Sequence, residues 1–296
     1  MPEGIILKGV GGLYSVKCSA GIYFCRARGL FRKSGQKPLP GDHVDFSITD
    51  EKDMEGYLSH IHQRKNSLIR PAVANVDLAF IIMSIKNPEP DLLLVDKLLC
   101  IFEEKGIESV LCINKADLGS PGDIENIANQ FEAAGYEIIV MDAKSGYGID
   151  KIERDIRGRV CNLAGHSGVG KSTILNRFIG NEVMETGGLS EKISRGKHTT
   201  RHAQFVESAG GYIVDTPGFS NLDAGLLLEQ DEIKNLYKEF ADESPHFRFN
   251  GCMHINEPDC GIKYAVNEGL ISQKRHERYV KIYTQAKEAK TKRRGY

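Results

Sequence analysis

Residues 160–173 read Val-Cys-Asn-Leu-Ala-Gly-His-Ser-Gly-Val-Gly-Lys-Ser-Thr, and this stretch decides the fold. Its apolar start predicts a buried strand, its middle matches G-x-x-x-x-G-K-S, and a helix is expected from Thr173. The glycines let backbone N–H groups converge on phosphates, the lysine reaches the outer phosphates, and the serine binds Mg²⁺. A simple glycine-rich turn is the competing interpretation. The residues expected to contact phosphate are Gly165, His166, Ser167, Gly168, Val169, Gly170, Lys171, Ser172 and Thr173.

Upstream of this loop, strands alternate with helices. Buried strands are expected over 76–83, 109–113 and 137–141, with a helix over 91–105. This alternation predicts an α/β domain with a parallel sheet and helices on both faces. Ligands bind such sheets at the carboxyl ends of the strands. The second strand leads there into Asn114-Lys115-Ala116-Asp117, and the third leads into Asp142-Ala143-Lys144-Ser145.

These strand-end motifs indicate GTP rather than ATP. A carboxylate at Asp117 accepts hydrogen bonds from guanine N1–H and N2–H₂, groups that adenine does not offer, and Asn114, Lys115 and Ser145 are expected to complete the base site. A further strand leads into Asp215-Thr216-Pro217-Gly218. Its acid and glycine are expected to hold Mg²⁺ through water and to sense the γ-phosphate. A P-loop kinase or ATPase is disfavoured by the base motif.

The order of the motifs is unusual, because the base-reading segments at 114 and 142 precede the phosphate loop at 165. GTPases usually run the other way. A compact domain with neighbouring termini can be closed and reopened elsewhere, so the sequence predicts a circularly permuted GTPase. The chain would leave this domain shortly after Gly218, and we expect hydrolysis to move the C-terminal region.

The first seventy residues have a different pattern. Short β-rich pieces separated by Gly and Pro turns between residues 4 and 48 predict a small OB-fold barrel, and Pro71 marks the domain boundary. A basic loop with an aromatic residue lies between two of these pieces. Cations neutralise phosphates and aromatic rings stack on bases, so this loop is typical of RNA binding, although a charged loop is often only solvated. The expected RNA contacts are Arg28, Phe31, Arg32 and Lys33.

Near the C-terminus, Cys252, His254 and Cys260 bring three metal-ligand side chains within nine residues. Structural zinc prefers four Cys and His ligands in tetrahedral geometry. The spacing therefore predicts a zinc site, and the competing interpretation is a metal-free loop. Beyond it, residues 262–290 are expected to be helical. The last helix begins near Ser272 and is expected to present cations to an RNA backbone, namely Lys274, Arg275, Arg278 and Lys281.

Together these features resemble the ribosome small subunit-dependent GTPase A family. The resemblance rests on the segment 28–33, on the permuted motifs, on Gly196-Lys197-His198-Thr199-Thr200 and on the Cys/His cluster, and it covers essentially the whole chain. It implies a GTPase that binds the small ribosomal subunit and its rRNA, is stimulated by the subunit, and acts late in its maturation. The family pattern has a further cysteine where this chain has Phe247. The adjacent His246 is the candidate fourth zinc ligand, and the alternatives are a site that is incomplete, closed by water or lost.

The residue that directs the attacking water is not obvious. Many GTPases place a glutamine after the glycine of the fourth motif, but Phe219 follows Gly218 here. An apolar ring cannot orient water, so we expect slow turnover by the free enzyme. The first candidate is His198, which the resemblance supports as a residue brought into place on the ribosome; His166 competes with it. Thr200, or less favourably Thr199, is expected to complete the Mg²⁺ shell.

Composition sets the remaining limits. The net charge of −1 combines about +4 over residues 1–70, +7 over 271–296 and −12 between them, which is consistent with anionic partners at both ends. The seven cysteines argue against a disulfide framework, and five of them are expected to be core thiols: Cys18, Cys25, Cys100, Cys112 and Cys161. Because no apolar run reaches the length of a membrane helix and no signal peptide is evident, we expect a cytoplasmic monomer with no membrane contact.

The sequence thus predicts three domains. Residues 1–68 are expected to form the OB-fold, 69–228 the permuted GTPase domain, and 229–296 a zinc-binding helical domain. The main hypothesis is a GTP hydrolase of small-subunit maturation that binds GTP or GDP, Mg²⁺, one Zn²⁺ and rRNA. The alternative is a GTP-gated RNA-binding module in which hydrolysis is incidental.

Overall fold

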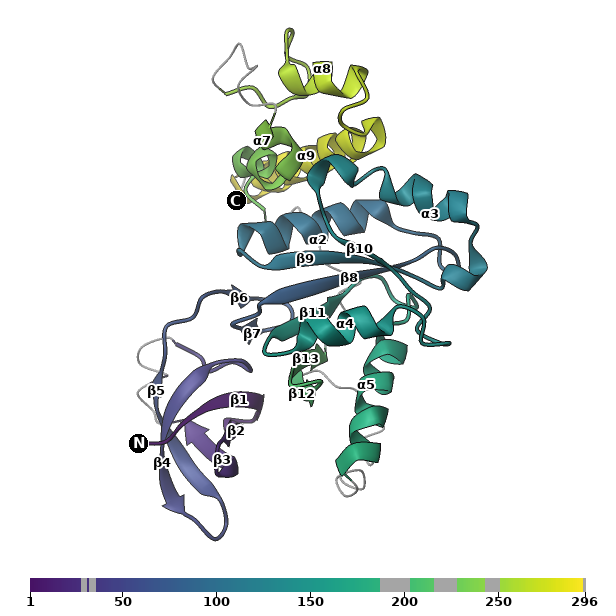
Figure 1. Cartoon of the computed structure of the whole chain (residues 1–296). Helices are drawn as coiled ribbons and strands as arrows, with labels where there is room; N and C mark the ends of the chain where they lie inside the picture. Colours follow the sequence, from purple (N-terminus) through teal and green to yellow (C-terminus); the bar gives the residue numbers. More distant parts are fainter. Residues whose placement is uncertain (28–30, 32–35, 187–202, 216–227, 243–250, 295–296) are drawn as a thin grey trace. The chain divides into compact units, whose positions relative to one another are not determined.

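The computed structural model describes residues 1–27, 31, 36–186, 203–215, 228–242 and 251–294. The chain divides into two compact units. Figure 1 labels the helices and strands along the chain. One unit comprises Met1–Ala79, Asp150–Leu163 and Lys171–Phe219. The other comprises Phe80–Ile149, Ala164–Gly170 and Ser220–Tyr296. Both units contain segments that are distant in sequence, as expected for a chain whose GTPase motifs are permuted.

The first unit begins with a five-stranded barrel. Its strands are β1 (Glu3–Val10), β2 (Leu13–Cys18), β3 (Gly21–Ala27), β4 (His43–Asp50) and β5 (Glu55–Ile61). They pair in the order β1-β2-β3-β5-β4, and a further β1–β4 pairing closes the barrel. Alternate residues point inward and form a core that includes Ile6, Val16 and Phe46. The predicted barrel is confirmed, and β5 is a strand that the sequence pattern did not reveal.

In its described residues, the rest of the first unit comprises a small hairpin, three strands and two helices that flank the phosphate-loop segment in sequence. A small hairpin of β6 (Ser67–Leu68) and β7 (Val73–Ala74) surrounds a cis Arg70–Pro71 peptide bond. Strand β11 (Val160–Ala164) pairs in parallel with β13 (Gly211–Asp215), and β13 pairs antiparallel with β12 (Gln204–Ser208). The helices of this unit are α4 (Ile149–Ile156) and α5 (Lys171–Thr186).

The second unit carries the base-side strands β8 (Leu78–Ser84), β9 (Glu108–Asn114) and β10 (Ile138–Val140). Strand β9 lies between the other two and pairs in parallel with β10. Helix α2 (Leu92–Glu104) starts where the Asp91 carboxylate accepts a hydrogen bond from the Leu94 N–H. Helix α3 (Pro121–Ala128) starts at a capping box formed by Ser120 and Asp123. The alternation predicted from the sequence is confirmed in this unit.

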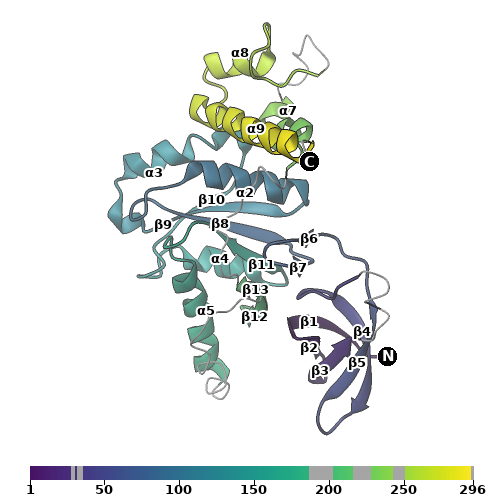
Figure 2. The same cartoon turned by 180° about the vertical axis from the view of Figure 1, so that it is seen from behind.

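The C-terminal part of this unit consists of η5 (Gln230–Leu236), α7 (Lys238–Asp242), α8 (Gly261–Asn267) and α9 (Gln273–Arg294). Figure 2 shows α9 beside α2, and the two helices are in contact. Tyr237 and Tyr279 are almost completely buried, and their rings meet edge to face at 5.1 Å between centroids. None of the helices in the described ranges is long and apolar enough to cross a membrane.

A buried ionic cluster joins α9 to α2 and corrects one expectation from the sequence. Arg275 donates to Asp96 at 2.6 Å and also bonds Glu239, and Arg278 donates to Asp96 at 2.5 Å and to Gln130 at 2.7 Å. Arg275 is 2% exposed and Arg278 is 8% exposed. The prediction that these two arginines face an RNA backbone is therefore wrong, because both are used inside the fold; Lys274 and Lys281 remain exposed.

Candidate GTP site

The Asn114 side chain connects three segments of the predicted nucleotide site. It is the last residue of β9 and only 1% exposed. Its Nδ2 donates to the Val169 carbonyl of the phosphate loop at 2.7 Å, and its Oδ1 accepts from the Ala143 N–H at 2.9 Å. One buried amide thus fixes the strand end, the phosphate loop and the loop after β10 against one another.

Lys115 adds a second connection between the base motif and the phosphate loop. Its backbone adopts the left-handed conformation, with φ of 59°. Its Nζ donates to the Gly168 carbonyl at 2.9 Å and also to the Asn87 carbonyl. Asn87 precedes a cis peptide bond to Pro88. This Asn-Pro loop was not predicted as part of the site, although an Asn-Pro pair after a buried strand is a turn signal that could have revealed it.

Asp117 and Ser145 lie in two neighbouring loops. Asp117 is exposed in the short turn η1 (Ala116–Leu118), and the Ala116 N–H donates to the Met141 carbonyl at 3.1 Å, which brings the loops side by side. Hydrogen bonding by Ser145 and by the Lys144 N–H lowers the pKa of the Asp142 carboxyl, so this group is ionised and shapes the turn that presents Ser145. Both Asp117 and Ser145 are exposed at this edge of the sheet.

The phosphate loop requires glycine at two positions where its backbone lies very close to neighbouring atoms. A Cβ at Gly165, where φ is +140°, would stand 2.1 Å from the Ile82 carbonyl oxygen of β8. A Cβ at Gly170, where φ is +105°, would stand 2.2 Å from Asn114 Nδ2. An L side chain is therefore excluded by contact as well as by backbone strain. Since the second contact is the Asn114 amide itself, the phosphate loop can close on the base motif only with glycine at 170.

Helix α5 follows this loop and begins at Lys171, two residues before the predicted start at Thr173, so Lys171, Ser172 and Thr173 form its first turn. Burial lowers the pKa of Lys171, which means that its charge is poorly solvated without an anion. A phosphate beside the ammonium group would reverse that penalty. Ser172 and Thr173 are exposed at the helix start, where the helix dipole and free N–H groups favour anions.

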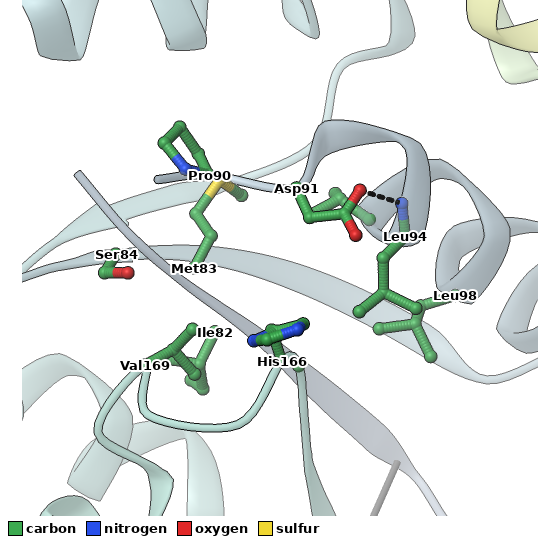
Figure 3. A pocket seen from close by; sticks show the side chains of 11 residues that line it. Ile82, Met83, Ser84, Pro90, Asp91, Leu94, Leu98, His166 and Val169 are labelled. Carbon is green, nitrogen blue, oxygen red and sulfur yellow. Dashed lines mark hydrogen bonds between the residues drawn. The ribbon is translucent and has the colours of Figure 1, made fainter. Parts of the chain in front are cut away.

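His166 lies in a pocket beside the phosphate loop. The pocket is lined by the end of β8, by the first turns of α2, including Leu94 and Leu98, and by Gly165 and Val169 (Figure 3). The imidazole Nδ1 is 2.8 Å from the Ser167 carbonyl oxygen. Figure 3 shows the ring between the loop and the apolar start of α2. This position suits packing of the loop against α2; the catalytic alternative for His166 stays a prediction.

Several predicted residues lie outside the described part of the chain or only partly within it. Asp215 ends β13 and pairs through its backbone with Gln204, but its side chain is not described. Phe31 is half-buried and packs against the barrel core. The others lie outside the described residues: Arg28, Arg32, Lys33, His198, Thr199, Thr200, Gly218 and His246.

Cys252, His254 and Cys260 form the group that the sequence predicted. All three are buried, and their ligand atoms lie within 4.8 Å of one another. His254 Nδ1 is 3.3 Å from the Cys260 sulfur. Burial lowers the pKa of His254 to about 4 and raises the pKa of Cys252 to about 11, so the imidazole is neutral and available as a ligand. Two thiols and one neutral imidazole fit zinc in donor chemistry, and a fourth ligand would complete the tetrahedron.

Neighbouring groups hold the backbone of this cluster in place. The Glu257 carboxylate accepts from the N–H groups of Met253, Ile255 and Asn256 at 2.8–3.0 Å. Although burial alone would raise it, the Glu257 pKa is lowered by these backbone hydrogen bonds. His276 on α9 is 2.8 Å from the His254 carbonyl oxygen. The cluster is therefore tied to the same helix that carries Arg275.

Comparison with known proteins identifies the family. The model of the RsgA GTPase family matches residues 61–225, and that of the RsgA N-terminal domain matches residues 3–58. A small ribosomal subunit biogenesis GTPase RsgA of Clostridium perfringens is 45% identical over 279 residues, which cover 94% of this chain and 96% of the relative. The chain belongs to the RsgA GTPase family. A second RsgA, from Caldanaerobacter subterraneus, is 41% identical over 99% of this chain and 98% of its own.

Solved structures of similar proteins support the same fold. YjeQ from Thermotoga maritima aligns with a TM-score of 0.81 at 34% identity and covers 96% of this chain and 98% of its own. YloQ, described as a circularly permuted GTPase, aligns with a TM-score of 0.81 at 33% identity and covers 97% of this chain and 96% of its own. The predicted permutation is confirmed. As a member of the RsgA GTPase family, this protein is a GTP hydrolase, and GTP hydrolysis of this kind uses Mg²⁺.

Proposed function

We propose that this GTPase acts in the biogenesis of the small ribosomal subunit, binds its rRNA, and is stimulated by the subunit. The observation that carries the proposal is the extent of the similarity. Relatives with this printed function match 94–99% of the chain, including the barrel and the C-terminal helices, and not only the nucleotide motifs. The flanking parts that a general GTPase does not need are therefore shared.

The deciding experiment compares GTP hydrolysis by the pure protein with and without purified small subunits. The proposal expects a large increase in turnover with small subunits and none with an equal amount of large subunits. The alternative, a GTP-gated RNA-binding module, predicts GTP-dependent binding to small subunits without faster hydrolysis. That result would replace the enzymatic role with a docking role.

Within this function, we assign guanine recognition to Asp117, with Ser145 beside it and with Asn114 and Lys115 as positioning residues. The exposed loops that carry Asp117 and Ser145 support this assignment. Asp117→Asn should lose GTP and gain xanthosine triphosphate, because the amide matches xanthine and not guanine. Asp123→Asn, a neighbouring change on α3, is the control and should leave this preference unchanged. If Asp117→Asn preferred GTP over xanthosine triphosphate as strongly as the wild type does, the assignment would be refuted.

Phosphate binding is assigned to the loop from Gly165 to Gly170 together with Lys171, Ser172 and Thr173. Ser172 and Thr200 would hold Mg²⁺, with Asp215 acting through water and Gly218 sensing the γ-phosphate. The half-buried ammonium group of Lys171, whose pKa burial lowers, supports the assignment, since a bound phosphate would stabilise its charged form. Lys171→Ala should abolish GTP binding in a fluorescent-nucleotide titration, whereas Lys151→Ala, on α4, should not.

Catalysis is assigned to His198. Subunit-stimulated turnover of His198→Ala should fall by about 10²-fold or more with normal GTP affinity, the range expected when a water-positioning group is lost. His166→Ala is the matched comparison, because its imidazole contacts the loop carbonyl of Ser167. Stimulated turnover that survives in His198→Ala and disappears in His166→Ala would reverse the assignment.

RNA binding is assigned to Arg28, Arg32 and Lys33, with Phe31 between them. Replacing the three cations by alanine should weaken binding to small subunits and reduce its salt dependence. Lys52→Ala, which removes an exposed cation from the turn between β4 and β5, is the control. An unchanged salt dependence in the triple variant would remove this loop from the interface.

Zinc is assigned to Cys252, His254 and Cys260, with His246 as fourth ligand. The buried thiols and neutral imidazole support the first three. Purified protein should contain zinc, and His246→Ala should bind it at least tenfold more weakly. Unchanged zinc affinity in His246→Ala would exclude that residue.

We further propose that residues 1–68, 69–228 and 229–296 form three domains and that the protein is a cytoplasmic monomer. Light scattering would test the oligomeric state.

A further inference from the structure

A second cluster of ligand-type side chains lies on the barrel. Glu3 on β1, Asp45 on β4 and His62, directly after β5, place their ligand atoms within 4.8 Å of one another. His62 Nε2 and Asp45 Oδ1 are 3.0 Å apart. Among the described residues, the Glu3 carboxylate makes no hydrogen bond and no ion pair. None of these residues belongs to the GTP motifs or to the Cys252, His254 and Cys260 group.

Strand register explains why these side chains meet. Glu3 pairs with Asp45 across β1 and β4, and Asp45 pairs with His60 across β4 and β5. Their neighbours Val44 and Ile61 point into the core and are 0% and 4% exposed, so Asp45, His60 and His62 share the outer face. The His62 N–H donates to the His43 carbonyl at 2.9 Å, which keeps this backbone in the ladder past the end of β5.

A bulge aims the histidine at the carboxylates. The β4–β5 register shifts between Asp45 and Phe46, where β5 has one extra residue. Such a bulge twists the strand and redirects the side chains beside it. The His60 and His62 rings lie 5.3 Å apart between centroids. Three well-paired strands therefore supply the cluster, which makes it more rigid than one formed on a loop.

The donor set and its spacing suit a divalent transition metal. Ligand atoms about 2.1 Å from one tetrahedral ion are about 3.4 Å apart, so His62 Nε2 and Asp45 Oδ1, which are 3.0 Å apart, need to separate only slightly to share an ion. Imidazole with carboxylate favours Zn²⁺ and its first-row neighbours over Mg²⁺ and Ca²⁺, which take oxygen ligands. The side chains of His62 and Asp45 are 39% and 22% exposed, so an ion can enter.

We propose that Glu3, Asp45 and His62 form a binding site for a divalent transition-metal cation on the outer face of the barrel. An ordinary His–Asp hydrogen bond explains two of the three residues but leaves the Glu3 carboxylate beside Asp45 without a counter-charge. A cation compensates both carboxylates. On binding, His62 carries its proton on Nδ1, and Asp45 Oδ1 changes from hydrogen-bond acceptor to metal ligand. The ion then connects β1 to β4 and β5 at the start of the chain.

The test is equilibrium dialysis of the full chain against Zn²⁺, followed by metal analysis. The wild type should bind one ion more than His62→Gln or Glu3→Gln, or hold that ion at least tenfold more tightly. Glu3→Gln keeps the His62–Asp45 hydrogen bond and so should fold normally. Glu55→Gln, an exposed carboxylate at the other end of β5, is the matched control and should bind like wild type.

Co²⁺ absorption separates this site from the thiol site, because only thiolate ligands give an intense sulfur-to-metal charge-transfer band. That band should be unchanged in both variants while the dialysis stoichiometry falls. Mn²⁺, which prefers nitrogen and oxygen ligands, should broaden the His60 and His62 ring signals first in proton spectra. Equal metal binding by wild type and both variants would overturn the proposal, and so would a loss of the same size in Glu55→Gln.

Discussion

Replacing Arg275 by methionine removes the central cation of the buried cluster between α9 and α2. Glu239, whose side chain is 2% exposed, loses its bonding partner, while Asp96 keeps Arg278. Removing one partner of a buried ion pair costs about 3–5 kcal/mol, because the remaining charge is left uncompensated. The guanidinium also lies 5.0 Å from the Phe131 ring and 4.8 Å from the Tyr237 ring. Methionine fills most of this volume, so we expect a loss of about 3–5 kcal/mol in the free energy of unfolding.

Urea unfolding followed by far-ultraviolet circular dichroism measures this loss, since the chain has no tryptophan for fluorescence. Lys274→Met, a change at the exposed neighbour, should alter stability by less than about 0.5 kcal/mol. Adding Glu239→Leu to Arg275→Met should recover most of the loss, because the orphaned charge is then removed. A loss below about 1 kcal/mol in the single variant, or no recovery in the double variant, would refute the reasoning.

Three further predictions follow from hydrogen bonds and burial. Asn114→Ala removes the hydrogen bonds that this side chain makes with the Val169 carbonyl and the Ala143 N–H, so the free energy of unfolding should fall by about 2–4 kcal/mol and GTP should bind at least tenfold more weakly. A GTP affinity of Asn114→Ala equal to that of the exposed Asn129→Ala control would contradict this. Ser120→Ala breaks the capping box of α3, and thermal unfolding should show a loss of about 1 kcal/mol in stability. An unchanged stability would show that this cap does not stabilise the helix. Burial, together with the nearby Cys18 thiol, raises the pKa of Cys25 to about 11, so about one Cys25 thiol in a thousand is ionised at pH 8. Mass spectrometry after iodoacetamide treatment should therefore find Cys25 unmodified in the folded protein. Labelling of Cys25 as fast as that of the half-buried Cys18 would exclude the raised pKa.

Local patterns predicted the elements that position the GTP site. The strand expected over 109–113 is β9 at Glu108–Asn114, and the helix expected over 91–105 is α2 at Leu92–Glu104. These predictions succeeded because apolar period and strand-end motifs are properties of neighbouring residues. The same reasoning placed Asn114 in the site but did not reveal that its side chain joins the loops of the site. Its two hydrogen bonds join segments 29 and 55 residues away, and no local pattern specifies such partners.

Two predictions failed, the surface position of the arginines of α9 and the number of barrel strands, because local patterns do not reveal contacts between distant segments. Arg275 and Arg278 were assigned to the surface because cations on a helix are usually solvated, whereas their partner Asp96 lies 179 residues before Arg275. The informative signal was Asp96 itself, a carboxylate between Val95 and Leu98 on the apolar face of α2. Strand β5 was missed although Leu58 and Ile61 are buried in it. The extra residue at its bulge breaks the strict alternation by which strands are recognised.

The pairing of Asp96 with Arg275 also bears on how the chain folds as it is synthesised. Asp96 is made long before its cation, and nearly all of the protein must be translated before the carboxylate is compensated. Until then α2 carries an unpaired charge on the face that must become buried, so the second unit cannot reach its final packing early. We therefore expect a chain that stops before residue 275 to keep the GTP motifs but to expose part of its core, and to be degraded by proteases faster than the full chain.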